Sequence, residues 1–380
     1  MISAIFGKVL ASRGVVFNGL ERTVGFLKEL EPEPVQLLKR DTLFKVNKEF
    51  LLCLSHQGKE YPLSVNALKN VCKILKIPAS YINKTASEKL TERILAESPE
   101  REDGQWTLFL WKDINSGEPF VAGVKEGPLY SNRDFLAAVT QSGILDRNNL
   151  EVVQHAVNTD IIAVYALSKE KKAYDRGNNF DYKIGLALFH SETSDQGFVM
   201  RPYYEIYSRN ALGETLTFDF VSSEALVKIP GKTGVYSQEI AKTLSEFDLG
   251  KLSEDFEVAI QLLNAVFEAD TISYGLLKKA RGFVRRVFNS PGSGDLGKEA
   301  TAEIIPEYSE FRNERKEQLK EMKPFLANNL TANFHFPLYL HRLYQFPATV
   351  EAADSFILSK EVVYKTMAEL AERINIGNIS

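Results

Sequence analysis

The apolar positions along the chain follow two periods, one typical of helices and one typical of strands. Between residues 62 and 96, apolar side chains recur every three or four positions, as on one face of a helix. Ser64 precedes the first run as a candidate N-cap, Ser87 precedes the second, and Pro78 disfavours helical geometry in the residue before it. We therefore predict a pair of short helices within an N-terminal α+β region of residues 1–100.

A β-rich core is predicted for residues 101–232, after the charged, turn-prone stretch ESPEREDGQ. Its apolar runs are short and are separated by turn residues, as strands are. These runs are WTLFLWKDINSGEPFVAGVKEG, DIIAVYAL, DYKIGLALFHS, GFVMRPYYEIYSR and TLTFDFVSS. The polar loop SKEKKAYDRGNNF, between the second and third of these runs, is long enough to move or to hold a ligand.

The helical period returns near residue 235 and continues towards the end of the chain. Apolar stripes mark SQEIAKTLSEF, SEDFEVAIQLLNAVFEA and SYGLLKKARGFVRRVF, so residues 233–380 are predicted to form a helical C-terminal region. The three regions together predict an α+β fold with a mixed or antiparallel sheet core, an N-terminal helical pair and a helical C-terminal region.

Composition and charge narrow the class of protein. With 44% apolar and 25% charged residues, the 380-residue chain is ordinary for a soluble globular protein. Its net charge of -4 means that nucleic acid would need a local basic patch. Cys53 and Cys72 provide neither a disulfide framework nor a four-ligand zinc site. No apolar run reaches the roughly 18 residues of a membrane span, and the start of the chain lacks signal-peptide features, so we expect a cytoplasmic protein without membrane contact.

The stretch NSPGSGDLGKEA, residues 289–300, reproduces most of the phosphate-binding pattern G-x-x-x-x-G-K-[ST] but has Glu299 at the hydroxyl position. The segment before it has helical periodicity instead of the strand that a phosphate loop needs, so Pro291 and Gly292 are interpreted as a helix end. A second fragment, PGKTG, lacks the leading glycine. Turns are the preferred interpretation of both, and contact between residues 292–298 and a ligand stays open.

The helical segment before this glycine-rich run, residues 272–290, is basic on one side. Its positive residues are Lys278, Lys279, Arg281, Arg285 and Arg286, and it contains no acidic residue. Such a face could neutralise several phosphates and bind nucleic acid in a salt-dependent way. The alternative is a surface helix whose charges pair with the acidic stretch of residues 299–310.

The predicted strand MRPYYEIYSR interleaves arginine and tyrosine. Because side chains alternate along a strand, one face carries Arg201, Tyr203, Glu205, Tyr207 and Arg209. Tyrosine rings can stack on bases while arginines contact phosphates. The alternative is a solvated sheet face that selects the same residues as cross-strand pairs.

Catalytic chemistry has little support in the sequence. His190 with Glu192 and Asp195 could approach a metal in a loop, but no third ligand is placed beside them, and structural roles are preferred for all five histidines. There is no glycine-flanked serine elbow and no dinucleotide fingerprint. We therefore predict no catalytic residue, no metal ligand and no cofactor.

Three segments resemble a family encoded by phages and plasmids, domain of unknown function 932. They are YPLSVNALKNVCKILKIPASYINKTASEKLTERIL, GPLYSNRDFLAAV and LALFHSETSDQGFVMRPYYEIYSRNAL, which together span about residues 62–212. The third matches the family's Arg-x-x-Cys-x-Asn-x-Leu at Asn210 and Leu212, whereas Glu205 and Ser208 replace the arginine and the cysteine. The resemblance implies a mobile-element protein of a bacterial cytoplasm and supplies no catalytic residues.

The basic helix, the arginine–tyrosine strand and the resemblance together predict a non-enzymatic phage or plasmid protein that associates with nucleic acid. The expected partner is nucleic acid, for example single-stranded DNA in replication or recombination, and the choice between DNA and RNA stays open. One alternative is a protein-binding module that occupies or inhibits a host or phage protein. A second is a metal-dependent hydrolase or nuclease. Whether the protein forms a homo-oligomer stays open.

Overall fold

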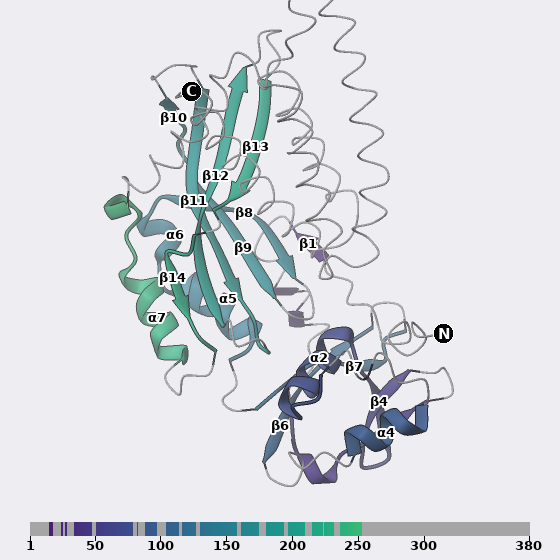
Figure 1. The fold of residues 1–380 in the computed structure, drawn as a ribbon. Helices are drawn as coiled ribbons and strands as arrows, with labels where there is room; N and C mark the ends of the chain where they lie inside the picture. Colours follow the sequence, from purple (N-terminus) through teal and green to yellow (C-terminus); the bar gives the residue numbers. More distant parts are fainter. Residues whose placement is uncertain are drawn as a thin grey trace, which may run out of the picture.

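The computed structural model describes the N-terminal two thirds of the chain, with gaps (Figure 1). The described residues are 15–17, 24–25, 27–28, 34–47, 51–78, 82, 88–96, 104–113, 116–126, 130–157, 161–174, 180–193, 197–209, 215–222, 224–231 and 236–252. The predicted basic helix, the glycine-rich run and most of the predicted helical C-terminal region lie outside these residues.

An eight-stranded antiparallel sheet forms the centre of the described structure, in the order β1-β8-β9-β11-β12-β13, with β10 added beside β11 and β14 beside β12. Its strands are β1 (Val15–Phe17), β8 (Leu150–Val157), β9 (Ile162–Ser168), β10 (Lys172–Tyr174), β11 (Phe180–His190), β12 (Phe198–Arg209), β13 (Thr215–Val221) and β14 (Val227–Ile229). The long hairpin of β11 and β12 pairs from Phe180 opposite Ser208 to His190 opposite Phe198.

One face of this sheet packs against helices (Figure 1). These helices are α5 (Asn132–Gln141), α6 (Ile144–Arg147) and α7 (Tyr236–Glu246), followed by the 3-10 helix η4 (Leu249–Leu252). Helix α5 begins with a capping box, in which the Ser131 hydroxyl accepts the Asp134 N–H and the Asp134 carboxylate accepts the Ser131 N–H. Apolar residues of α5, α6 and α7 form one core with alternate residues of the strands.

The opposite face carries the other set of alternate strand residues. Its apolar cluster comes entirely from strands β8, β9, β11, β12 and β13 and their immediate flanks, and it includes Tyr165, Phe189 and Tyr203. Glycine is needed beside this cluster at position 185, because a Cβ there would lie 1.8 Å from the carbonyl oxygen of Ala166. The arginine–tyrosine face of β12 belongs to this side of the sheet.

A second core lies in the N-terminal part, between two three-stranded sheets and two helices (Figure 1). One sheet has the order β2-β6-β7, and the other has the order β3-β4-β5. The elements are β2 (Val35–Leu38), the 3-10 helix η2 (Lys39–Asp41), β3 (Leu43–Val46), β4 (Leu52–His56), β5 (Lys59–Pro62), α2 (Val65–Ile74), α4 (Glu88–Ala96), β6 (Gln105–Lys112) and β7 (Pro119–Lys125). Both cysteines are buried, and burial raises the pKa of the Cys72 thiol to about 11.

Polar contacts join this N-terminal part to the large sheet. The Asn66 side chain on α2 donates to the Thr193 hydroxyl at 3.2 Å, and the Lys125 ammonium on β7 donates to the Gly231 carbonyl at 2.9 Å. The Ser64 hydroxyl caps α2 by accepting the Ala67 N–H, and it also donates to the Ala122 carbonyl. The residues just before and at the start of α2 therefore fix the helix both to its own sheet and to the loop after β11.

The α+β prediction with antiparallel sheets is confirmed. The predicted runs contain β6, β7, β9, β11, β12 and β13, and α7 lies where a helix is predicted. Other elements are additions to the predicted pattern. They include the strands β1, β2, β3, β8 and β14, the helices α5 and α6 inside the predicted β-rich core, and the short strand β10 inside the polar loop. Among the helices of the described residues, none combines the length and the apolar character needed to cross a membrane.

Candidate nucleic-acid interface

Strand β12 places the predicted arginine–tyrosine face on the side of the large sheet that α5, α6 and α7 do not cover. Its exposure changes along the strand, since Tyr203 is 1% exposed whereas Glu205 and Tyr207 are half-buried. The face thus passes from an apolar cluster to a more open polar end. Arg209 lies at the end of β12, where it pairs with Thr215 of β13.

Tyr203 belongs to the buried part of this face, contrary to the role predicted for it as a stacking surface. Its ring packs against Tyr165 with ring centroids 5.2 Å apart, and its hydroxyl donates to the carboxylate of Asp219 on β13. A base could reach neither face of a ring that is 1% exposed. Tyr203 therefore acts inside the sheet, where it holds Asp219.

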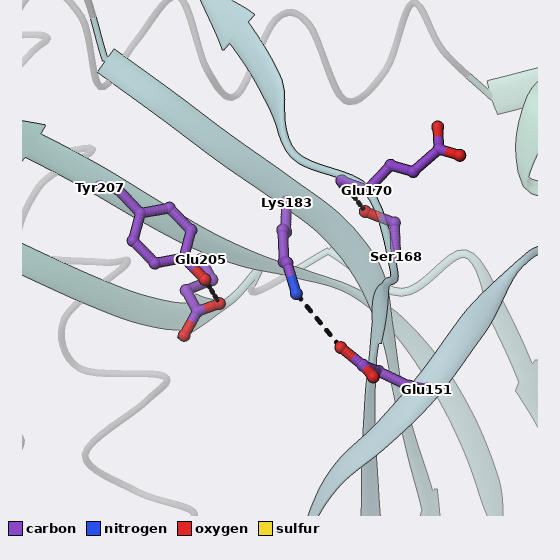
Figure 2. Close-up of polar contacts among 6 residues, drawn as sticks. All are labelled: Glu151, Ser168, Glu170, Lys183, Glu205 and Tyr207. Carbon is purple, nitrogen blue, oxygen red and sulfur yellow. Dashed lines mark hydrogen bonds and ion pairs between the residues drawn. The ribbon is translucent and has the colours of Figure 1, made fainter.

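Tyr207 stands at the open end of the face, and its hydroxyl donates to the Glu205 carboxylate two positions away (Figure 2). The Lys171 ammonium lies over the Tyr207 ring, 3.5 Å from the ring centroid. Lys171 comes from the polar loop that the sequence indicates as a possible ligand holder. At the start of that loop, the Ser168 hydroxyl donates a hydrogen bond to the Glu170 carbonyl at 2.7 Å (Figure 2).

Two further cations lie on this side of the sheet. The Lys183 ammonium on β11 pairs with the Glu151 carboxylate on β8 at 3.2 Å, as Figure 2 shows. The Arg201 guanidinium lies 5.5 Å from the centroid of the Phe189 ring, which places it among the apolar residues and away from Tyr207. The open end of the face thus combines Tyr207 with the ammonium groups of Lys171 and Lys183.

Glu205 lies between charged residues of both neighbouring strands at this polar end. Its cross-strand neighbours are Lys183 on β11 and Asp219 on β13. Partial burial is the main cause that raises the pKa of the Glu205 carboxyl; Asp219 acts in the same direction, whereas the Tyr207 hydroxyl, Lys183 and Lys171 oppose the shift. Burial and the neighbouring Glu205 also raise the pKa of the Tyr207 hydroxyl, which keeps it a donor.

A second group of polar residues surrounds His190 at the other end of β11, and it is buried. The His190 Nδ1 lies 3.0 Å from the Asn132 side-chain oxygen, so in the neutral ring Nδ1 carries the proton. Glu192 accepts the Asn132 backbone N–H at 2.5 Å. The imidazole stacks on Phe135 with centroids 5.0 Å apart, and burial with the nearby Lys125 charge lowers the pKa of His190 to about 3.

These contacts give His190 the structural role that the sequence favours for it. Tyr130 and Tyr236 also pack on the imidazole, with ring centroids at 5.3 and 6.0 Å. Burial and Asp134 raise the pKa of the Tyr130 hydroxyl to about 12. In the described part of the chain, no group of three potential metal-ligand side chains lies together.

Sequence reasoning missed Lys171 and Lys183 as members of the candidate interface. The signal for Lys171 is present in the loop SKEKKAYDRGNNF, where three lysines lie near the start of a long polar connection. The signal for Lys183 is the alternation of β11, but its proximity to Tyr207 depends on the β11–β12 register. That register depends on the whole hairpin and is not visible in either strand alone.

The basic-helix residues Lys278, Lys279, Arg281, Arg285 and Arg286 lie outside the described residues. Comparison of the chain with protein-family models, with curated proteins and with solved structures finds no match.

Proposed function

We propose that this protein binds single-stranded DNA, without catalysis, through the open polar end of the β12 face. One observation carries the proposal: the Lys171 ammonium lies 3.5 Å from the centroid of the Tyr207 ring, with Lys183 on the neighbouring strand. An aromatic ring beside flexible cations is the combination that binds bases by stacking and phosphates by charge. The four residues of the polar end that carry this proposal are Lys171, Lys183, Glu205 and Tyr207.

Each residue has a distinct expected role. Tyr207 offers its ring to a base, and Lys171 exchanges its position over that ring for a phosphate contact. Lys183 leaves its ion pair with Glu151, whose side chain is 49% exposed, and contacts a second phosphate instead. The Lys183 side chain is only 14% exposed, so the exchange must keep its ammonium paired with an anion, which a phosphate does. Arg209, farther along β12, is expected to contact a further phosphate of the bound DNA.

The nearby carboxylates limit the strength of binding. The carboxylates on this face, Glu151, Asp181, Glu205 and Asp219, outnumber the ammonium groups of Lys171 and Lys183, and the chain as a whole has a net charge of -4. Affinity is therefore expected to be modest and to fall steeply with salt. The predicted basic helix, with Lys278, Lys279, Arg281, Arg285 and Arg286, supplies further phosphate contacts in this proposal.

The biological setting is part of the same proposal. The resemblance of residues 62–212 to a phage and plasmid family supports a mobile-element protein that acts in a bacterial cytoplasm. The finer parts of the fold, an N-terminal helical pair and a helical C-terminal region, are proposed with it. Replication and recombination are the processes that expose single strands for such a protein.

The test is a fluorescence-anisotropy titration of labelled single- and double-stranded DNA of about 20 nucleotides at about 50 and 200 mM salt, with and without magnesium. Single strands should bind more tightly at low salt. Replacing Lys171 and Lys183 by alanine should reduce the slope of log affinity against log salt by about 1.4, because each phosphate contact contributes about 0.7.

The charge-matched control is the double alanine variant of Lys69 and Lys242, two exposed lysines on α2 and α7. This control should keep the slope of the unmodified protein. Absence of single-strand binding at low salt contradicts the proposed function. Magnesium-dependent cleavage of the DNA would favour a nuclease instead.

A further inference from the structure

Glu205 has a hydrogen-bond acceptor beside the edge of the Tyr207 ring. The Tyr207 hydroxyl donates to Oε2 of Glu205, and Oε1 has no hydrogen-bond partner among the described residues. Figure 2 shows the carboxylate beside the phenol, with its second oxygen directed away from the hydroxyl. A stacking surface and a charged acceptor thus lie side by side on one strand.

Two cations act on Glu205 and both are directed elsewhere, since the Lys171 ammonium lies over the Tyr207 ring. Lys183 is the cross-strand neighbour of Glu205 in the β11–β12 register, yet its ammonium pairs at 3.2 Å with Glu151 on β8. Figure 2 shows the Lys183 side chain pointing towards Glu151. Asp219, on the other side of Glu205, is held by the Tyr203 hydroxyl. The Glu205 carboxylate therefore keeps acceptor capacity that a ligand can use.

We propose that Glu205 makes this face prefer bases that carry an exocyclic amino group, such as cytosine, over thymine. The inference rests on the proposed binding of single-stranded DNA. A base that stacks on Tyr207 places its edge near Glu205, where an amino N–H donates to Oε1. Carboxylates accept from the cytosine amino group in this way. Thymine has only a ring N–H between two carbonyl oxygens, and a carboxylate repels those oxygens.

The direct test compares binding of labelled all-dC and all-dT strands of about 20 nucleotides at about pH 8, which is well above the ordinary pKa of a carboxyl group. The preference for dC should fall roughly tenfold in Glu205→Gln, the scale of one charged hydrogen bond. The new amide retains an acceptor but adds an N–H donor that suits a thymine carbonyl. Glu205→Asp, which withdraws the carboxylate from the ring, should also reduce the preference.

Glu170→Gln is the matched control, since it removes the same charge from an exposed residue beside Lys171 without releasing Lys183 from Glu151. It should raise affinity for both strands and leave their ratio unchanged. A ratio that Glu205→Gln and Glu205→Asp do not alter, or that Glu170→Gln alters equally, overturns the base preference while single-strand binding stands. Failure of the unmodified protein to bind either strand overturns both the preference and the proposed function.

Discussion

The two ends of strand β11 place polar residues in opposite environments. His190, at one end, lies on the helix-covered side, where Asn132 and three aromatic rings surround it. Lys183, towards the other end, lies on the opposite side beside the half-buried Glu205 and Tyr207. A buried polar group without a partner is costly, whereas a partly exposed charged group can exchange one ionic partner for another and stay paired. The His190 end therefore stabilises the fold, and the Lys183 end is available to a ligand.

Acidification tests this difference with the largest expected effect. Burial lowers the pKa of His155 to about 4 and, with the Lys125 charge, that of His190 to about 3, from an ordinary value of 6.5. The unfolded chain therefore binds protons that the folded chain does not, and stability present above pH 6.5 is lost as pH falls towards these values. From about pH 7.5 to 5.5, the two histidines should lower the free energy of unfolding by about 3 kcal/mol, measured by urea denaturation.

The sign of this pH effect distinguishes the two regions. The pKa of Glu205 is raised above 4.5, so the folded protein binds its proton more readily and Glu205 opposes the histidine effect on acidification. Glu205→Gln should therefore steepen the loss of stability with acid. His155→Phe should remove about half of the loss, because His155 is one of the two buried histidines with a lowered pKa. The substitution breaks no hydrogen bond of the ring, since neither ring nitrogen of His155 has a hydrogen-bond partner among the described residues. Unchanged acid sensitivity in His155→Phe would count against burial as its cause.

Removing a partner inside the His190 cluster gives the next effect in size. Asn132→Ala deletes the side-chain oxygen that faces Nδ1 of His190, which leaves a buried ring N–H without that acceptor. The expected loss is about 2 kcal/mol in the free energy of unfolding, measured by urea denaturation at neutral pH. Arg133→Ala, at the neighbouring exposed position of α5, should change stability by less than about 0.5 kcal/mol. Equal losses in both variants would remove the contrast.

A smaller effect separates the two tyrosines of β12. Tyr203→Phe removes the hydroxyl that donates to the buried Asp219 and should cost about 1.5 kcal/mol. Tyr207→Phe removes a hydroxyl from a half-buried carboxylate that water can reach, and should cost less than about 0.5 kcal/mol. Thermal unfolding of the two variants in parallel checks the difference. A larger loss in Tyr207→Phe would show that the buried and open parts of the face are assigned in the wrong order.

Local patterns predict much of this fold. Alternating side chains in DYKIGLALFHS and GFVMRPYYEIYSR indicate β11 and β12, and Ser64 marks the start of α2. The strand β8 does not emerge as clearly, because an irregularity between Val152 and Gln154 breaks its alternation. The helix α5 does carry a local signal, since Phe135, Leu136 and Val139 follow the Ser131 cap at helical spacing, but the strands around it favour a β-rich interpretation. Their burial is decided by tertiary packing, which local propensity does not contain.

The candidate interface is less predictable than the fold. Period-two alternation places Tyr203 and Tyr207 on one face, as the structure has them, but it cannot show that one is buried and the other half-exposed. Lys171 joins Tyr207 only through the path of a loop, and Lys183 only through a cross-strand register. Exposure and register are properties of the assembled sheet, so sequence alone identifies candidate residues and not the site.

Binding of single-stranded DNA by Tyr207→Ala tests the central claim most directly. The comparison variant is Tyr182→Ala, on β11 at the same end of the sheet but on its opposite side. Fluorescence anisotropy at low salt should show a loss of roughly tenfold for Tyr207→Ala, the scale of one stacked base, with both variants folded by circular dichroism. Tyr182→Ala should retain the affinity of the unmodified protein. Equal affinity in Tyr207→Ala and the unmodified protein would contradict the assignment of the open end of β12 as the binding face.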